Sequence, residues 1–149
     1  MNVFCSSRRI ALVLALAVLG LAWPVSAVQA GAFHASGTYA VTSVHGDVFE
    51  GTQDGSARPG GPFSGTFSVK RTANGLRYDG VATWDFSSGD TLTYTWHVDF
   101  DDETGLYVGT YVITGGTGRL AGASGSGSYI VAPAGGGMGE FEMDGTLSY

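Results

Sequence analysis

The amino-acid sequence predicts an all-β domain, most simply a small eight-stranded antiparallel barrel with up-and-down connections. The first observation behind this prediction is a strict alternation of apolar and polar residues in several segments. In the segment 91–100, every second position is apolar: Leu92, Tyr94, Trp96, Val98 and Phe100. The segments 76–86 and 140–149 show the same pattern. A period of two over about ten residues is typical of a strand with one buried face and does not fit an amphipathic helix.

The second observation is the turn chemistry between these segments. Asn74-Gly75 predicts a tight hairpin, and the segments 87–90 and 102–105 contain glycine where a turn needs a positive φ. The segment 52–62 has no alternation and contains two prolines, so it is predicted as a loop, either a plain connection or a lid. In chain order, the predicted strands are 37–44, 48–51, 63–71, 76–86, 91–100, 106–115, 126–132 and 140–149.

The same strands could pack as a β-sandwich, and pattern alone leaves this alternative open. Consecutive hairpins and long strands favour the barrel, because closure removes the exposed sheet edges. A barrel of eight strands has an interior that side chains fill or that holds one small ligand.

The first thirty residues differ in composition from the rest. Arg8 and Arg9 precede an apolar run from Ile10 to Trp23, and small residues follow it. This order is typical of a secretory signal peptide, so residues 1–30 are predicted as a signal cleaved after Ala30, and residues 31–149 as a single barrel domain. The expected location is secreted or periplasmic.

The net charge limits the classes of partner, and the cysteine content limits the disulfides that the mature domain can form. The net charge is −6 at neutral pH and becomes more negative when Arg8 and Arg9 are removed. Such a surface repels phosphate backbones, so no nucleic acid is expected as a partner, nor an anionic membrane after signal cleavage. The single cysteine, Cys5, lies in the predicted signal, so the mature domain has no disulfide.

The most distinctive segment is Gly115 to Gly127, with the sequence GGTGRLAGASGSG between a predicted strand and the next. It lacks the Lys-Ser/Thr ending of a phosphate-binding loop and is followed by a strand rather than a helix, so nucleotide binding is excluded. Leu120 is the one large apolar residue in the turn and is expected to plug the barrel, which the turn is expected to close.

This turn resembles the allene oxide cyclase barrel-like superfamily, which includes dirigent proteins and related bacterial secreted proteins. The match covers Gly115 to Gly125, and the final GTLSY from Gly145 to Tyr149 is similar to the last strand of that family. The resemblance implies an eight-stranded barrel, and a homo-dimer or homo-trimer as its assembly. Because the glycine turn is architectural and the family's functions differ, no catalytic residue is carried over to this chain.

Three polar residues are weak candidates for acid–base catalysis. His97 and Asp99 point to one face of their predicted strand, and Asp85 lies on the matching face of the preceding strand. If that face were interior, they could form a cluster for an isomerisation or cyclisation. The opposite face holds Trp84 and Trp96 and makes the better core, which would leave the three residues on the exterior.

Aromatic residues are the candidates for ligand binding, namely Trp84, Trp96, Tyr94 and Tyr78. Core packing explains them as well, and the two uses are compatible. His34 and His45 lack metal-ligand spacing, so neither a metal nor a cofactor is expected.

The sequence therefore predicts a secreted barrel that binds a small apolar or aromatic molecule, with cofactor-free cyclase or isomerase activity as an extension. The alternative is a non-catalytic structural or interaction module whose barrel interior is filled with side chains. An empty interior with convergent polar groups would favour the first.

Overall fold

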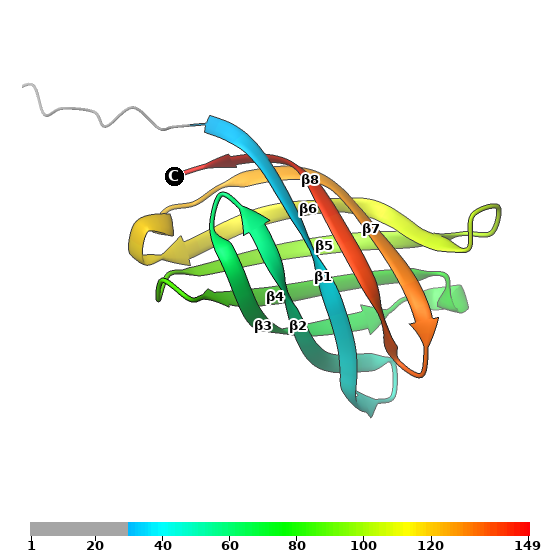
Figure 1. Cartoon of the computed structure of the whole chain (residues 1–149). Helices are drawn as coiled ribbons and strands as arrows, with labels where there is room; N and C mark the ends of the chain where they lie inside the picture. Colours follow the sequence, from blue (N-terminus) through cyan, green and yellow to red (C-terminus); the bar gives the residue numbers. More distant parts are fainter. Residues whose placement is uncertain (1–29) are drawn as a thin grey trace, which may run out of the picture.

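Residues 30–149, the part of the chain that the structure (a computed structural model) describes, form eight strands that pair antiparallel in chain order. The last strand pairs with the first from Ala30↔Ser148 to Ala40↔Met138, and this ladder closes the barrel (Figure 1). The predicted eight-stranded barrel is confirmed, and the β-sandwich alternative is wrong. The strands are β1 (Ala30–His45), β2 (Val48–Arg58), β3 (Gly61–Arg71), β4 (Arg77–Phe86), β5 (Thr91–Asp101), β6 (Leu106–Thr117), β7 (Gly125–Gly135) and β8 (Met138–Ser148).

Two short 3-10 segments complete the described elements, η1 (Ala73–Gly75) and η2 (Gly118–Leu120). No helix within residues 30–149 has the length and hydropathy that a membrane crossing requires. The predicted signal peptide lies outside the described residues except for Ala30, which already belongs to β1.

The predicted loop 52–62 is wrong, because its first seven residues continue β2. Strand β2 pairs with β1 from Val48 to Arg58 and with β3 from Val48 to Ala57. Its inward positions beyond Phe49 are small or polar, namely Gly51, Gln53, Gly55 and Ala57. Without large apolar residues at alternate positions, the strand gives no hydrophobic period in the sequence, although its backbone is fully paired.

The predicted Asn-Gly hairpin is confirmed at η1, where Asn74 has φ 76° and Gly75 has φ 68°. Both residues are left-handed, as a tight turn between right-twisted strands requires. The turns at Gly89 and Gly105 also place glycine at a positive φ, as expected.

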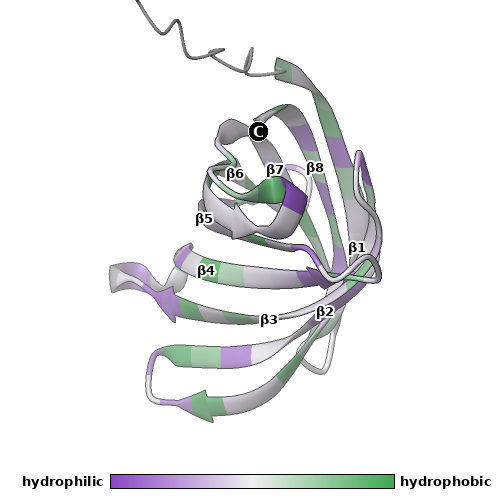
Figure 2. Cartoon of the chain, turned by 90° about the vertical axis from the view of Figure 1, so that its left-hand side faces the viewer, coloured by the Kyte–Doolittle hydropathy of each residue, from purple (hydrophilic) through white to green (hydrophobic). Residues whose placement is uncertain are grey.

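Alternate residues of each strand point into the barrel, and the others face outward, so hydrophobic and hydrophilic residues alternate along the strands in Figure 2. Large apolar side chains fill one end of the barrel. Phe63 stacks on Trp84 with ring centroids 3.8 Å apart, and Trp84 meets Tyr94 edge-on at 4.9 Å. This packed end also holds the two ends of the described chain, and Figure 2 views the barrel from that side.

The glycine-rich turn covers the packed end, which corrects the expectation that it closes the barrel. Lateral closure comes from the β1–β8 ladder, while Leu120 of η2 is buried as the predicted plug. Asp90, in the β4–β5 turn, accepts hydrogen bonds from the Arg119 backbone N–H at 3.0 Å and from Arg119 Nε at 2.9 Å. Gly118 has φ 65°, and a Cβ there would collide with the Asp90 carboxylate, so the turn requires glycine at this position.

Candidate functional site

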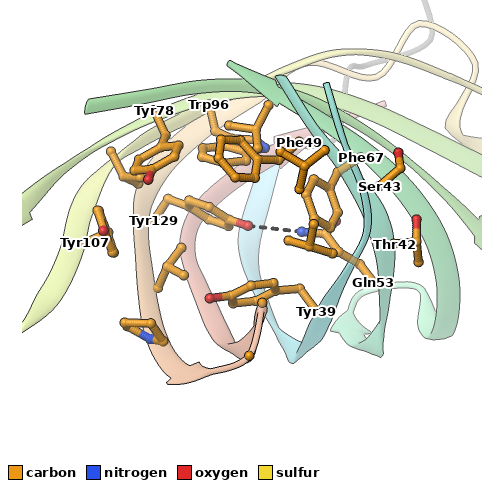
Figure 3. A pocket seen from close by; sticks show the side chains of 18 residues that line it. Tyr39, Thr42, Ser43, Phe49, Gln53, Phe67, Tyr78, Trp96, Tyr107 and Tyr129 are labelled. Carbon is orange, nitrogen blue, oxygen red and sulfur yellow. Dashed lines mark hydrogen bonds between the residues drawn. The ribbon is translucent and has the colours of Figure 1, made fainter. Parts of the chain in front are cut away.

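The opposite end of the barrel is hollow. A cavity of about 610 Å³ opens between the β1–β2, β3–β4, β5–β6 and β7–β8 hairpins, toward the right-hand end of the barrel in Figure 1. Its volume is within the range of small-molecule sites in proteins. The interior is therefore filled at one end only. The walls are formed mainly by aromatic and branched apolar side chains (Figure 3): Tyr39, Val41, Phe49, Phe67, Val69, Tyr78, Trp96, Val98, Tyr107, Tyr129 and Val131.

Cross-strand pairs of glycine and an aromatic residue shape the walls. Gly80 of β4 lies opposite Trp96 of β5, and a Cβ on Gly80 would lie 2.5 Å from the indole ring. Gly51 lies opposite Phe67 in the same way, and Gly139 opposite Tyr39, each with 2.7 Å between an added Cβ and the ring. The missing side chains let these rings lie along the barrel wall, and the space at the centre remains open.

Gln53 lies at the floor of the cavity, between the hollow end and the packed end. Its side chain is 2% exposed. Gln53 Oε1 accepts hydrogen bonds from Trp84 Nε1 at 2.8 Å and from the Tyr94 hydroxyl at 2.9 Å. Gln53 Nε2 donates to the Tyr129 hydroxyl at 3.1 Å, the bond drawn in Figure 3.

The orientation of the Gln53 amide follows from this network. An indole N–H can only donate, so the Gln53 atom that faces Trp84 must be the carbonyl oxygen. The amide nitrogen is then turned toward Tyr129, whose hydroxyl oxygen accepts one of its protons. Because buried polar groups are costly to leave unpaired, this network fixes Gln53 at the centre of the barrel.

The described lining of the cavity is uncharged. None of the described residues that line it is Asp, Glu, Lys, Arg or His. Its titratable groups are tyrosines, and burial raises the pKa of the Tyr39, Tyr107 and Tyr129 hydroxyls. The hydroxyls therefore stay protonated at neutral pH, so they act as neutral hydrogen-bonding groups.

The structure divides the four predicted ligand-binding residues into two groups. Trp96 and Tyr78 line the cavity, and their rings are seen along its upper wall in Figure 3. Trp84 and Tyr94 are fully buried beneath it and contact the cavity through Gln53. Sequence reasoning missed Gln53, because it lies in the segment interpreted as a loop, and did not single out Tyr39, Tyr107 or Tyr129.

The predicted acid–base candidates lie on the outer surface of the barrel. His97 pairs in register with Asp79 across β4 and β5, and its ring lies 3.4 Å from the Thr110 hydroxyl on β6. Asp99 pairs with Arg77, and Asp85 pairs with Thr91 at the far end of the ladder. The three side chains therefore share the outer face, as the core-packing interpretation expected. Asp85 lies six residues along β4 from Asp79, the residue that pairs with His97, so the three candidate side chains do not converge on one point.

One exposed cluster has the donor types of a metal site. His34 Nδ1 of β1 lies 2.7 Å from Asp144 Oδ1 of β8, and Glu142 is close enough that the ligand atoms of all three fall within 4.8 Å. The pairing joins residues 110 positions apart, so sequence spacing gave no sign of it. All three side chains are exposed, and a surface hydrogen bond accounts for the contact.

Comparison with solved structures finds a similar barrel fold in two dirigent proteins. The pterocarpan synthase dirigent protein GePTS1 superposes with a TM-score of 0.59 at 14% identity, over 82% of this chain and 86% of that chain. The pterocarpan synthase dirigent protein PsPTS1 gives a TM-score of 0.58 at 15% identity, over 81% of this chain and 96% of that chain. No protein-family model matches the chain, and no curated protein matches it. At these identities, the likeness shows a shared barrel fold.

Proposed function

From a barrel fold shared with dirigent proteins, we propose that this protein binds one small, uncharged, largely apolar or aromatic molecule in the open end of the barrel. The observation that carries the proposal is the cavity of about 610 Å³ with aromatic walls and a polar floor at Gln53. Apolar walls with a few placed polar groups are the usual composition of a small-molecule site.

The absence of ionic side chains among the described lining residues supports an uncharged ligand. An ion in this cavity would lose its hydration without gaining a counter-charge, and that transfer is costly. The same absence favours binding over general acid–base catalysis. A general acid or base works best with a pKa near the working pH, whereas burial raises the pKa of the cavity tyrosines.

The filled-barrel alternative has no comparable support. Closely packed interiors leave few voids larger than a water molecule, and a space of this size is far larger. Pairing of glycines with aromatic rings around the cavity supports a wall adapted to keep the centre open.

A binding experiment with a matched pair of variants tests the proposal. The probes are 2-isopropenylnaphthalene, which is uncharged, and 2-naphthoate, which is an anion of similar size. Val131→Trp places a large ring in the cavity, while Ile130→Trp places the same ring on the outer face of the same strand. Calorimetric titration is expected to give measurable affinity for the uncharged probe, at least ten-fold weaker affinity for the anion, and loss of binding in Val131→Trp alone.

Two results would overturn the proposed function. One is the absence of binding by the uncharged probe in the folded protein. The other is equal binding by the two tryptophan variants, because binding at the outer surface or elsewhere would then be the explanation.

A further inference from the structure

The hydrogen-bonding groups at the cavity floor are not balanced between donors and acceptors. Trp84, Tyr94, Gln53 and Tyr129 form one cluster, and each of them is at most 2% exposed. The carbonyl oxygen of Gln53 has two lone pairs, and the indole of Trp84 and the hydroxyl of Tyr94 occupy both. The acceptor side of the amide is therefore saturated.

The donor side of the cluster is not saturated. One amide proton of Gln53 is donated to the Tyr129 hydroxyl oxygen. The second amide proton has no acceptor among the hydrogen bonds of the described residues, whereas the hydroxyl of Tyr129 lies within reach of the Tyr94 hydroxyl, whose oxygen can accept its proton. Both residues line the cavity, and Figure 3 shows the Tyr129 hydroxyl and the Gln53 amide meeting in its interior.

A spare donor in a buried cluster is costly unless it finds an acceptor. The cavity walls offer no carboxylate or imidazole acceptor among the described residues. A ligand oxygen that carries no proton, held at the floor, would accept the spare amide proton of Gln53 without adding another donor. A ligand that brings only a C–H group to the same place would leave this proton unpaired.

We propose that the floor formed by Gln53 and Tyr129 selects ligands with a carbonyl oxygen, so that the preferred molecule is an uncharged aromatic ketone or a similar carbonyl compound. The molecule enters with its carbonyl group toward the floor and its ring between the aromatic walls. This inference rests on the proposed function and specifies the ligand of that cavity. Tyr129 is the specificity-determining residue, because its hydroxyl oxygen accepts one amide proton of Gln53 and so fixes the amide that presents the second proton to the cavity.

The test compares two probes of nearly identical shape. 2-Acetylnaphthalene carries a carbonyl oxygen where 2-isopropenylnaphthalene carries a methylene group, and their affinities are measured by calorimetric titration in three proteins. These are the unaltered protein, Tyr129→Phe and Tyr107→Phe. Tyr107 also lines the cavity, near the β5–β6 hairpin, and makes a matched control for the loss of one hydroxyl. Circular dichroism checks that both variants are folded.

The quantity of interest is the affinity for the ketone relative to the alkene, because this ratio cancels contributions that the two probes share. We expect the ratio to fall about ten-fold in Tyr129→Phe, as for the loss of one buried hydrogen bond. It should change by less than two-fold in Tyr107→Phe.

The outcomes separate this inference from the proposed function. If both probes bind and the ratio is unchanged in Tyr129→Phe, the carbonyl selection is wrong while the binding function stands. An equal fall in both variants would also overturn it, because the floor would then have no special role. If neither probe binds the unaltered protein, the proposed function fails and this inference fails with it.

Discussion

Replacement of Gln53 by leucine is the perturbation that tests the organisation of the barrel interior most sharply. Leucine has a similar size but no polar atom, so Gln53→Leu removes the acceptor of two fully buried donors, Trp84 Nε1 and the Tyr94 hydroxyl. Each buried donor left unpaired costs about 1–3 kcal/mol. The Tyr94 hydroxyl can rotate toward Tyr129, and leucine is more favourably buried than glutamine. We therefore expect a net loss of about 3 kcal/mol in the free energy of unfolding.

The magnitude is large enough to measure in a domain of this size. For about 120 ordered residues, a loss of about 3 kcal/mol corresponds to a fall in Tm of about 12 °C. The assay is urea unfolding followed by near-ultraviolet circular dichroism, with thermal unfolding as a second measurement. A change below about 0.5 kcal/mol would show that the Gln53 network contributes nothing to stability.

Three further predictions concern the cavity wall, the packed end and acid stability. Gly80→Ala should push the Trp96 ring into the cavity and weaken binding of 2-isopropenylnaphthalene about ten-fold. The control is Gly115→Ala, where an added Cβ meets nothing within 4 Å, and it should leave the affinity unchanged. Tyr111→Phe should raise the free energy of unfolding by about 1 kcal/mol in urea titrations, because it removes a buried hydroxyl that has no partner among the described residues; a loss would contradict this. Hydrogen bonds from the Arg119 backbone N–H and from Ser88 lower the pKa of Asp90. The ionised Asp90 therefore stabilises the folded protein above the usual carboxyl pKa, and this stabilisation is lost as the pH falls through the lowered pKa. The difference in Tm between the unaltered protein and Asp90→Asn should therefore be largest near neutral pH and shrink as the pH falls below the usual carboxyl pKa, and a difference that does not depend on pH would contradict this origin.

Much of the fold could be predicted because several strands carry large apolar residues at every second position. Leu92, Tyr94, Trp96 and Val98 all point inward, as the alternation indicated. Strand β2 could not be found in this way. Its inward residues are small because aromatic rings from neighbouring strands occupy the space beside them, as Phe67 does at Gly51. The hydrophobic periodicity of a single strand carries no information about space that is filled by a side chain from a neighbouring strand.

The site was harder to predict than the fold for a related reason. Trp84 and Trp96 lie on the same face of the barrel wall and have similar sequence surroundings, yet one is packed and the other lines the cavity. What separates them is their position along the barrel axis, which depends on the register of neighbouring strands. Gln53 was missed because a polar residue in a glycine-rich segment is typical of a loop, and its burial becomes visible only when β2 is paired on both sides.

If the open end of the barrel is a binding chamber with a donor floor, 2-acetylnaphthalene should lie inside it with its carbonyl group at the floor. Intermolecular nuclear Overhauser effects between this ketone and the isotope-labelled protein measure its position. We predict contacts from the naphthyl protons to Trp96 and Val98, and from the acetyl methyl group to Tyr129 at the floor. Contacts confined to outer-face residues such as Ile130, or no contacts up to the solubility limit of the ligand, would show that the open end of the barrel does not bind the ketone.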